Sequence, residues 1–195
     1  MTREPTDLVP VTANRPPDPY ERKFMAGQGT VLYRDKHRAP WPLHAIMGAS
    51  ALAVIVAAVA TGELISLAIG LPVLAIVWLL FSVLRVTVSA GTVNVQYGLF
   101  GPEIPMAAIE SAAATTYDWK KFGGWGIRRS RDGEWIYNMP GDGGRAVRIV
   151  WRDRRGRRVV TLIGSPQHEQ LAAQIHGARA ALPAAPEARA LGSGD

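Results

Sequence analysis

Aromatic and basic side chains interleave around a glycine-rich loop at residues 119–129, which read WKKFGGWGIRR. Trp rings settle at the depth of lipid headgroups, while Lys and Arg attract headgroup phosphates, so the cluster predicts a docking loop for anionic lipid. The alternative is that Trp125 and Ile127 face the core of a domain and that the cations are only solvated. The candidate binding residues of this loop are Lys120, Lys121, Trp125, Arg128 and Arg129.

A second basic cluster occupies residues 152–158, where five arginines accompany one aspartate around a Gly turn. Its positive potential predicts contact with anionic lipid. Nucleic acid is the less favoured partner, because no stacking platform or recognised nucleic-acid motif accompanies the charge. The alternative is a charged hairpin tip that only keeps the domain soluble. The candidate residues here are Arg154, Arg155, Arg157 and Arg158.

Catalytic and metal-binding patterns have little support in this chain. His168 and His176 stand eight residues apart, and no acidic residue is placed to complete a metal site with both. The chain contains no cysteine, which excludes disulfides and thiolate ligands. The glycines at 123–126 lack the lysine and hydroxyl of a phosphate loop. We therefore expect no enzymatic activity, no cofactor and no metal.

Two charge-free apolar runs, residues 43–61 and 64–84, must position these clusters, and only Gly62 and Glu63 separate them. Helices of this length cross a hydrocarbon core of about 30 Å. A charge at the bilayer centre costs about 3 kcal/mol, so charge-free runs of this length favour membrane spans. A cleaved signal peptide is disfavoured because forty-two residues precede the first run. The sequence predicts a two-helix transmembrane hairpin in a multi-pass membrane protein.

Positive charge flanks the outer ends of this hairpin. Arg38 precedes the first run and Arg85 follows the second, whereas the connection offers only Glu63. Because cytoplasmic flanks carry the excess of Lys and Arg, both termini are expected in the cytoplasm, at the cytoplasmic (inner) membrane.

Small residues recur every four positions in the first run, at Ala45, Ala49, Ala53, Ala57 and Thr61. Such a face permits close helix packing in lipid. We favour packing against the second helix of the same chain, and an oligomerisation face is the alternative. A conducting path is disfavoured, since neither span carries a charged or amide side chain.

The remaining chain divides by composition. Residues 1–29 are Pro-rich and are expected to be disordered, residues 30–42 form a juxtamembrane segment, residues 85–182 form a domain, and residues 183–195 a flexible tail. Alternating apolar residues and Gly-rich turns predict seven short antiparallel strands in a sandwich or barrel. These strands are residues 85–89, 92–97, 109–116, 125–129, 134–139, 145–151 and 158–163.

One helix is expected to close the domain. Ser165 is a good N-cap, Pro166 suits the first helical position, and the helix should end near Pro183. Its apolar stripe consists of Leu171, Ile175, Ala178 and Leu182. The predicted fold class is therefore an α+β membrane protein: a helical hairpin followed by an antiparallel β domain with a C-terminal helix.

This organisation resembles the bacterial membrane proteins that carry a pleckstrin-homology-like (PH-like) domain. The likeness is carried by residues 85–88 (RVTV), 92–100 (TVNVQYGLF), Ile104-Pro105 with Ile109, 125–128 (WGIR), and Ser165-Pro166 with the helix behind it. The resemblance implies a seven-stranded β domain capped by a C-terminal helix and a cytoplasmic, non-enzymatic role in binding or assembly. It supplies no ligand and no functional residue.

These observations predict a membrane-anchored binding or scaffold protein whose cytoplasmic domain contacts anionic lipid headgroups or a protein partner. The alternatives are a homo-oligomeric membrane assembly module and, less favoured, an accessory subunit of a small channel or transporter.

Overall fold

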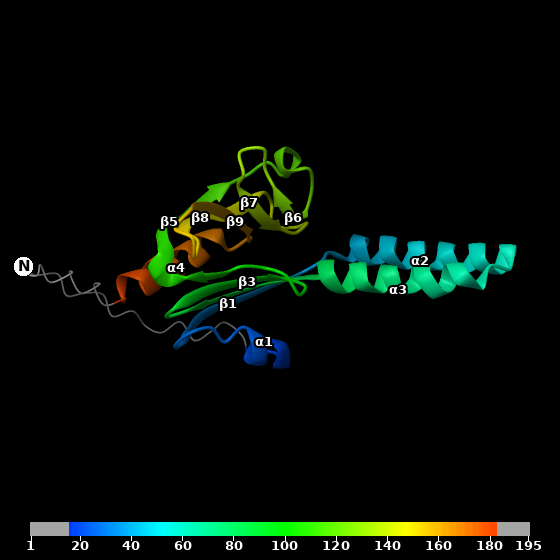
Figure 1. Cartoon of the computed structure of the whole chain (residues 1–195), viewed down its shortest axis with the longest axis horizontal. Helices are drawn as coiled ribbons and strands as arrows, with labels where there is room; N and C mark the ends of the chain where they lie inside the picture. Colours follow the sequence, from blue (N-terminus) through cyan, green and yellow to red (C-terminus); the bar gives the residue numbers. More distant parts are fainter. Residues whose placement is uncertain (1–15, 183–195) are drawn as a thin grey trace, which may run out of the picture.

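The structure, a computed structural model, describes residues 16–182 and has two parts (Figure 1). A β domain contains two sheets and a C-terminal helix, and a pair of long helices projects from one end of it (Figure 1). The architecture is therefore α+β, as predicted. Its strands number nine within residues 16–182, two more than the seven expected.

The projecting helices are α2 (Trp41–Thr61) and α3 (Leu64–Phe81), and both are long and apolar enough to cross a membrane. A left-handed Gly62 ends α2. Ala58 is the one fully buried side chain of α2, and α3 has none. Large apolar side chains such as Ile65 (75% exposed) point outward instead. A contiguous apolar surface along two whole helices is rare in water and is typical of a surface that faces lipid or another protein. The second run is shorter than predicted, because Val83 and Leu84 belong to a strand.

The small-residue face of α2 does not pack against α3, contrary to the interpretation favoured above. Its members Ala45, Ala49, Ala53 and Ala57 are all exposed. The two helices contact each other instead through Ala58, which is fully buried, and through Val54, which packs against Gly70. A Cβ added to Gly70 would lie 3.0 Å from Cγ1 of Val54.

The first sheet, sheet A, has the antiparallel order β1-β2-β3-β4. Its strands are β1 (Val31–Arg38), β2 (Val83–Ser89), β3 (Thr92–Tyr97) and β4 (Glu103–Pro105). The segment expected to be juxtamembrane is thus a full strand. Tyr33 and Asp35 face the core, and the charged Arg34 and Lys36 between them obscured the alternation. The helical hairpin is an insertion between two paired strands, β1 and β2.

The junction between the sheet and the helices is short and tied by backbone hydrogen bonds. Ala39 N–H donates to the carbonyl of Ser82 (2.8 Å), and Gly98 N–H donates to that of Val83 (3.0 Å). Gly98 has φ +61°, and a Cβ there would overlap the backbone of Leu80 in the last turn of α3. The β3–β4 turn therefore lies directly against the end of α3.

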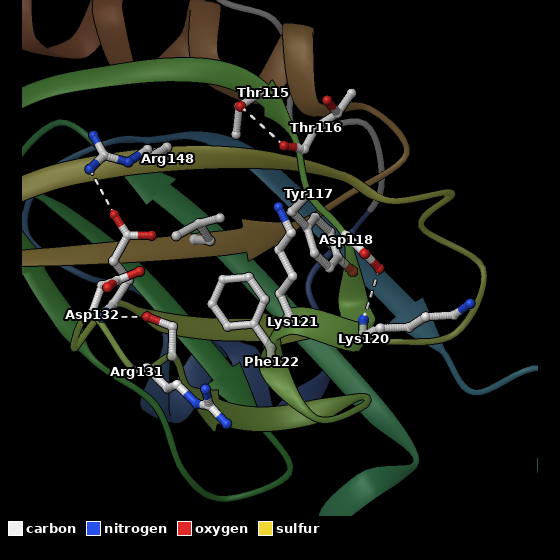
Figure 2. A pocket seen from close by; sticks show the side chains of 13 residues that line it. Thr115, Thr116, Tyr117, Asp118, Lys120, Lys121, Phe122, Arg131, Asp132 and Arg148 are labelled. Carbon is white, nitrogen blue, oxygen red and sulfur yellow. Dashed lines mark hydrogen bonds and ion pairs between the residues drawn. The ribbon is translucent and has the colours of Figure 1, made fainter.

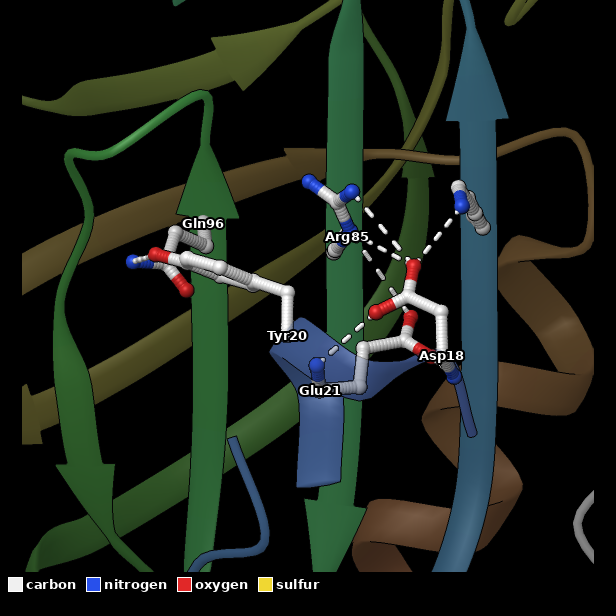
Figure 3. Close-up of polar contacts among 6 residues, drawn as sticks. Asp18, Tyr20, Glu21, Arg85 and Gln96 are labelled. Carbon is white, nitrogen blue, oxygen red and sulfur yellow. Dashed lines mark hydrogen bonds and ion pairs between the residues drawn. The ribbon is translucent and has the colours of Figure 1, made fainter. Parts of the chain in front are cut away.

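A short helix, α1 (Pro19–Phe24), covers the outer face of sheet A, so the prediction that residues 1–29 are disordered is wrong for this part. Asp18 and Glu21 form a capping box, and Glu21 is only 2% exposed. Asp18 also accepts a hydrogen bond from Lys36 (2.8 Å) and one from Arg85 (3.4 Å) (Figure 3). The proline content suggested disorder, but the capping box and the bonds of Asp18 to Lys36 and Arg85 attach the segment to sheet A. Residues 1–15 lie outside the described residues.

We expect Asp18→Ala to detach α1 from sheet A, because the change removes the N-cap and leaves Lys36 and Arg85 without this carboxylate. Loss of such a cap costs about 1–2 kcal/mol. Trypsin sites inside α1, Arg22 and Lys23, provide the measurement: cleavage there should accelerate several-fold. Glu103→Ala, which removes an exposed carboxylate of sheet A, is the control and should leave the rate unchanged.

The same contact has a defined pH dependence. Burial opposes ionisation of Asp18, but the hydrogen bonds from Lys36 and the backbone and the charge of Arg85 hold its pKa well below the usual value. A carboxyl with a depressed pKa contributes its full stability above its unfolded pKa of about 4 and loses it as the pH falls through the folded value. The attachment of α1 should thus be constant from pH 5 to 9 and weaken below pH 4. Weakening on the alkaline side of this window would contradict the assignment.

The second sheet, sheet B, has the order β5-β8-β9-β7-β6. Its strands are β5 (Ile109–Thr116), β6 (Gly126–Arg129), β7 (Trp135–Asn138), β8 (Arg145–Arg152) and β9 (Arg158–Gly164). Each lies within a residue or two of a predicted strand. The expectation of a wholly antiparallel sheet is wrong, because β9 inserts between β7 and β8 and so runs parallel to β7. Two short 3-10 helices, η1 (Met106–Ala108) and η2 (Trp119–Phe122), precede β5 and β6.

Helix α4 (His168–Ala180) packs on both sheets, and three members of the predicted apolar stripe, Leu171, Ile175 and Ala178, are buried as expected; the fourth, Leu182, follows the end of the helix and is half-buried against the core. Its start differs from the prediction. The N-cap position is Gln167, while the Ser165 hydroxyl is fully buried and donates to Asp35 of β1 (2.9 Å). The two sheets and α4 share one core, so residues 16–38 belong to the same domain as residues 83–182. The predicted tail at 183–195 lies outside the described residues.

Candidate membrane-facing site

The loop between β5 and β6 presents two stacked tryptophans. Asp118 caps η2 by accepting a hydrogen bond from the Lys120 N–H (3.0 Å), and Gly123, at φ +76°, ends it. This turn brings Trp119 and Trp125 together, with ring centroids 4.7 Å apart and planes 20° from parallel. Both remain exposed, at 37% and 43%. The core reading is therefore wrong for Trp125, although it holds in part for Ile127, which packs against the core.

Cations surround this tryptophan pair. The Nζ of Lys120 lies 5.7 Å from the ring centre of Trp119. Arg128 is exposed and donates from Nε to the carbonyl of Trp125 (3.1 Å). Lys121 is exposed on η2. Exposed aromatic faces beside ammonium and guanidinium groups that form no ion pair within residues 16–182 are suited to the boundary between water and lipid.

The loop lies at the end of the domain from which α2 and α3 project. A Cβ added to Gly126, the first residue of β6, would lie 3.4 Å from the ring of Phe81, the last residue of α3. A second exposed tip, Leu99 and Phe100 at 55% and 59%, follows Gly98 at the same junction. Sequence reasoning missed this tip as a surface. The sequence signal for this exposed tip was the apolar pair Leu99-Phe100 directly after the turn residue Gly98.

Arg129 lies further from this junction than Arg128. Its guanidinium lies 5.6 Å from the ring centre of Trp135, its pairing partner on β7, and donates toward the carbonyl of Gly133 (3.4 Å). Of the five predicted loop residues, the structure thus brings Lys120, Trp125 and Arg128 together, places Lys121 in the lining of a pocket behind them, and leaves Arg129 at the far end of β6.

The arginine hairpin between β8 and β9 belongs to another surface. Four of its arginines, Arg152, Arg154, Arg155 and Arg157, line a pocket of about 530 Å³ together with Trp151 and residues of β4 and η1. Pro105 of β4 pairs with Thr92, at the end of sheet A remote from the helices. Arg158 is paired with Glu110 (3.2 Å) and Arg157 with Asp153 (2.8 Å). Arg154 and Arg155 have no ion pair with the carboxylates of residues 16–182.

The two predicted clusters therefore do not form one site. The tryptophan loop is next to the helices, and the arginine hairpin points toward the opposite end of the domain. A bilayer crossed by α2 and α3 would meet the first and not the second.

A pocket of about 650 Å³ lies behind the loop (Figure 2). Its charged lining nearly balances: Lys120, Lys121, Arg131 and Arg148 against Asp118, Asp132 and Glu134. Arg148 is already paired with Glu134 (2.8 Å). A pocket of mixed sign does not attract phosphate as a single-sign cluster does.

A buried Ser–Asp–His group links β1 to the start of α4. Burial raises the pKa of Asp35, but its contacts with His37 and Ser165 more than offset this and lower it. The His37 Nε2 (3.0 Å) and the Ser165 hydroxyl (2.9 Å) both meet the same oxygen, Oδ2 of Asp35. Ser165 is fully buried and has no hydrogen bond to a histidine within residues 16–182, so this group lacks the nucleophile–base contact of acyl transfer. No cluster of three potential metal ligands occurs within residues 16–182.

Comparison of the chain with protein-family models, with curated proteins and with solved structures finds no match.

Proposed function

We propose that this chain is a membrane-anchored binding protein, and that its β domain contacts anionic lipid headgroups through the β5–β6 loop. The observation that supports it is the position of the Trp119–Trp125 pair, which is exposed, lies beside the cation of Lys120 and is next to the last residue of α3. If α2 and α3 span a bilayer, this pair lies at headgroup depth.

The proposed orientation places the domain and both termini in the cytoplasm, at the cytoplasmic membrane. Arg34, Lys36 and Arg38 precede α2 and Arg85 follows α3, whereas the α2–α3 connection carries only Glu63. This asymmetry is the one that orients cytoplasmic flanks. The β domain, with its two sheets of short, mostly antiparallel strands and its closing helix, is proposed to be PH-like.

Lipid cross-linking in the full chain tests the contact. Trp125 is replaced by the photoreactive residue benzoylphenylalanine, and the chain is reconstituted in vesicles of neutral lipid with or without about one-third anionic lipid. Trp135 is the matched control site: it is also an exposed Trp beside an arginine, but it lies at the other end of the β6–β7 pair. We expect lipid capture at position 125 and little at 135.

The charge contribution is tested in the same vesicles. Two lysines near an anionic surface contribute about 1 kcal/mol each, so Lys120→Gln with Lys121→Gln should lower the capture of anionic lipid by about tenfold or more. Arg154→Gln with Arg155→Gln removes equal charge at the remote hairpin and should change nothing. Equal capture at 125 and 135, or equal capture from neutral and anionic vesicles, would contradict the proposal.

A second candidate function, homo-oligomeric assembly, is favoured by one observation. The small-residue face of α2 is exposed and so is free to contact another copy. The mass of the detergent-solubilised chain distinguishes the two: a monomer at micromolar concentration removes the assembly hypothesis and leaves the lipid-binding proposal intact. A protein partner of the domain and an accessory role in a channel have no comparable observation in their favour.

A further inference from the structure

A groove lies between α2 and α3 on one side of the helix pair. It has a volume of about 280 Å³, and its walls are apolar except for His44 and the indole N–H of Trp78. The remaining lining residues are Met47, Gly48, Ala51, Leu71, Leu74 and Ala75. A Cβ added to Gly48 would meet nothing within 4 Å, so the groove is open at that point.

A second hollow of about 350 Å³ continues this groove toward the β domain, because His44 and Trp78 line both. Its other walls are the ends of β1 and β2, with Lys36, Arg38, Ser82 and Val83. Within residues 16–182 no carboxylate lines this part. One continuous groove is thus cationic where it meets the domain and apolar where it follows the helices.

Hydrogen-bond donors are gathered at the cationic end. The Trp78 N–H donates to Nδ1 of His44 (2.9 Å), so the hydrogen of the neutral His44 ring is on Nε2 and is available to another acceptor. Arg38 is exposed at the end of β1. Lys36 uses one ammonium hydrogen for Asp18 (2.8 Å) and retains two others.

We propose that this groove binds one anionic glycerophospholipid, with its phosphate against Arg38, Lys36 and His44 and an acyl chain along α2 and α3. The order of the two halves supports this assignment, because the cationic end adjoins the domain and the apolar end lies within the candidate spans. In a bilayer crossed by these helices, a phospholipid likewise places its phosphate at the surface next to the domain and its acyl chains alongside the helices. The combined volume lies within the range of about 300–1,000 Å³ typical of ligand pockets.

This inference rests on the proposed membrane anchoring but not on the β5–β6 loop. The two contacts involve different residues and sit on different elements, and each can be removed alone. A lipid held here would fix the angle between the domain and the bilayer, since the groove joins β1 and β2 to the helices.

Native mass spectrometry of the full chain, released from mild detergent during titration with phosphatidylglycerol or phosphatidylcholine, measures the binding. We expect one phosphatidylglycerol bound at least tenfold more tightly than phosphatidylcholine. Lys36→Gln with Arg38→Gln should weaken phosphatidylglycerol on the order of tenfold or more and should weaken phosphatidylcholine less, because its choline cation offsets the charge of the phosphate. Arg154→Gln with Arg155→Gln, an equal loss of charge, should have no effect.

The apolar half is tested separately. Gly48→Leu fills the groove and should weaken both lipids, whereas Ala53→Leu adds the same side chain on an exposed face of α2 and should weaken neither. An unchanged melting temperature shows that each variant is folded. Equal affinity for the two lipids, or phosphatidylglycerol binding that survives both Gly48→Leu and the double charge change, would overturn the proposal.

Cross-linking at position 125 separates this failure from that of the proposed function. If capture at position 125 persists while the chain binds phosphatidylglycerol no more tightly than phosphatidylcholine, the groove assignment is wrong and the loop contact stands. If capture at 125 is absent while the groove variants lose lipid, the reverse holds.

Discussion

A chain in which residues 39–82 are replaced by Asn-Gly, and which otherwise keeps residues 16–38 and 83–182, should fold as a soluble domain. Arg38 and Val83 are directly opposed in the antiparallel β1–β2 pair, so removal of the helical hairpin leaves two strand ends that a two-residue turn can join. Asn-Gly suits the type I′ turn that such a connection requires. We expect a single cooperative thermal transition and dispersed amide resonances in the absence of detergent.

The fragment 85–195 is the matched comparison and should not fold. It keeps every strand that was predicted from the sequence but lacks β1, α1 and the first two residues of β2. Tyr33 is fully buried, and loss of one such aromatic side chain costs about 3–5 kcal/mol, a large share of a typical stability of 5–15 kcal/mol. The fragment would also expose β2 as an apolar edge strand, which promotes aggregation. Equal melting temperatures for the two proteins would refute the view that β1 belongs to this domain.

Local patterns explain which parts of the fold were predictable. Strand β3 alternates apolar and polar residues between turn glycines, and β9 is a short β-branched and apolar run between turn glycines, so each was placed to within a residue or two. In β1 the inward Tyr33 and Asp35 alternate with Arg34 and Lys36. Because one inward residue is a carboxylate, the strand shows no alternation of apolar and polar residues in the sequence. The burial of Asp35 depends on Ser165, 130 residues away, and a pattern of neighbours carries no such information.

The same limit applies to the candidate sites. Composition identified both basic clusters, but their separation depends on Gly126 contacting Phe81 and on the arginine hairpin lying beside β4. The parallel pairing of β7 with β9 likewise depends on the order of strands in sheet B, which neighbouring residues do not specify. The amphipathic groove combines residues of β1, α2 and α3, and its cations lie in a segment that sequence reasoning assigned to the membrane flank.

Gly98→Ala should strongly destabilise the junction between the domain and the helices. At φ +61° an alanine costs about 1–2 kcal/mol, and its Cβ would in addition overlap the backbone of Leu80, which cannot move without shifting the last turn of α3. Overpacking of this kind typically adds 1–3 kcal/mol, so the total loss should reach about 2–5 kcal/mol. Thermal unfolding of the full chain in detergent measures it.

Gly156→Ala separates the two contributions. Gly156 has a similar φ of +73°, but a Cβ there meets nothing within 4 Å, so only the backbone strain remains and the loss should be about 1–2 kcal/mol. The Gly98 variant should also lower lipid capture at position 125, because Phe81 directly follows Leu80 and lies against Gly126, whereas the Gly156 variant should not. Equal losses of stability in the two variants would mean that the β3–β4 turn does not press on α3. The rigid coupling that holds the β5–β6 loop next to α3 would then need another source.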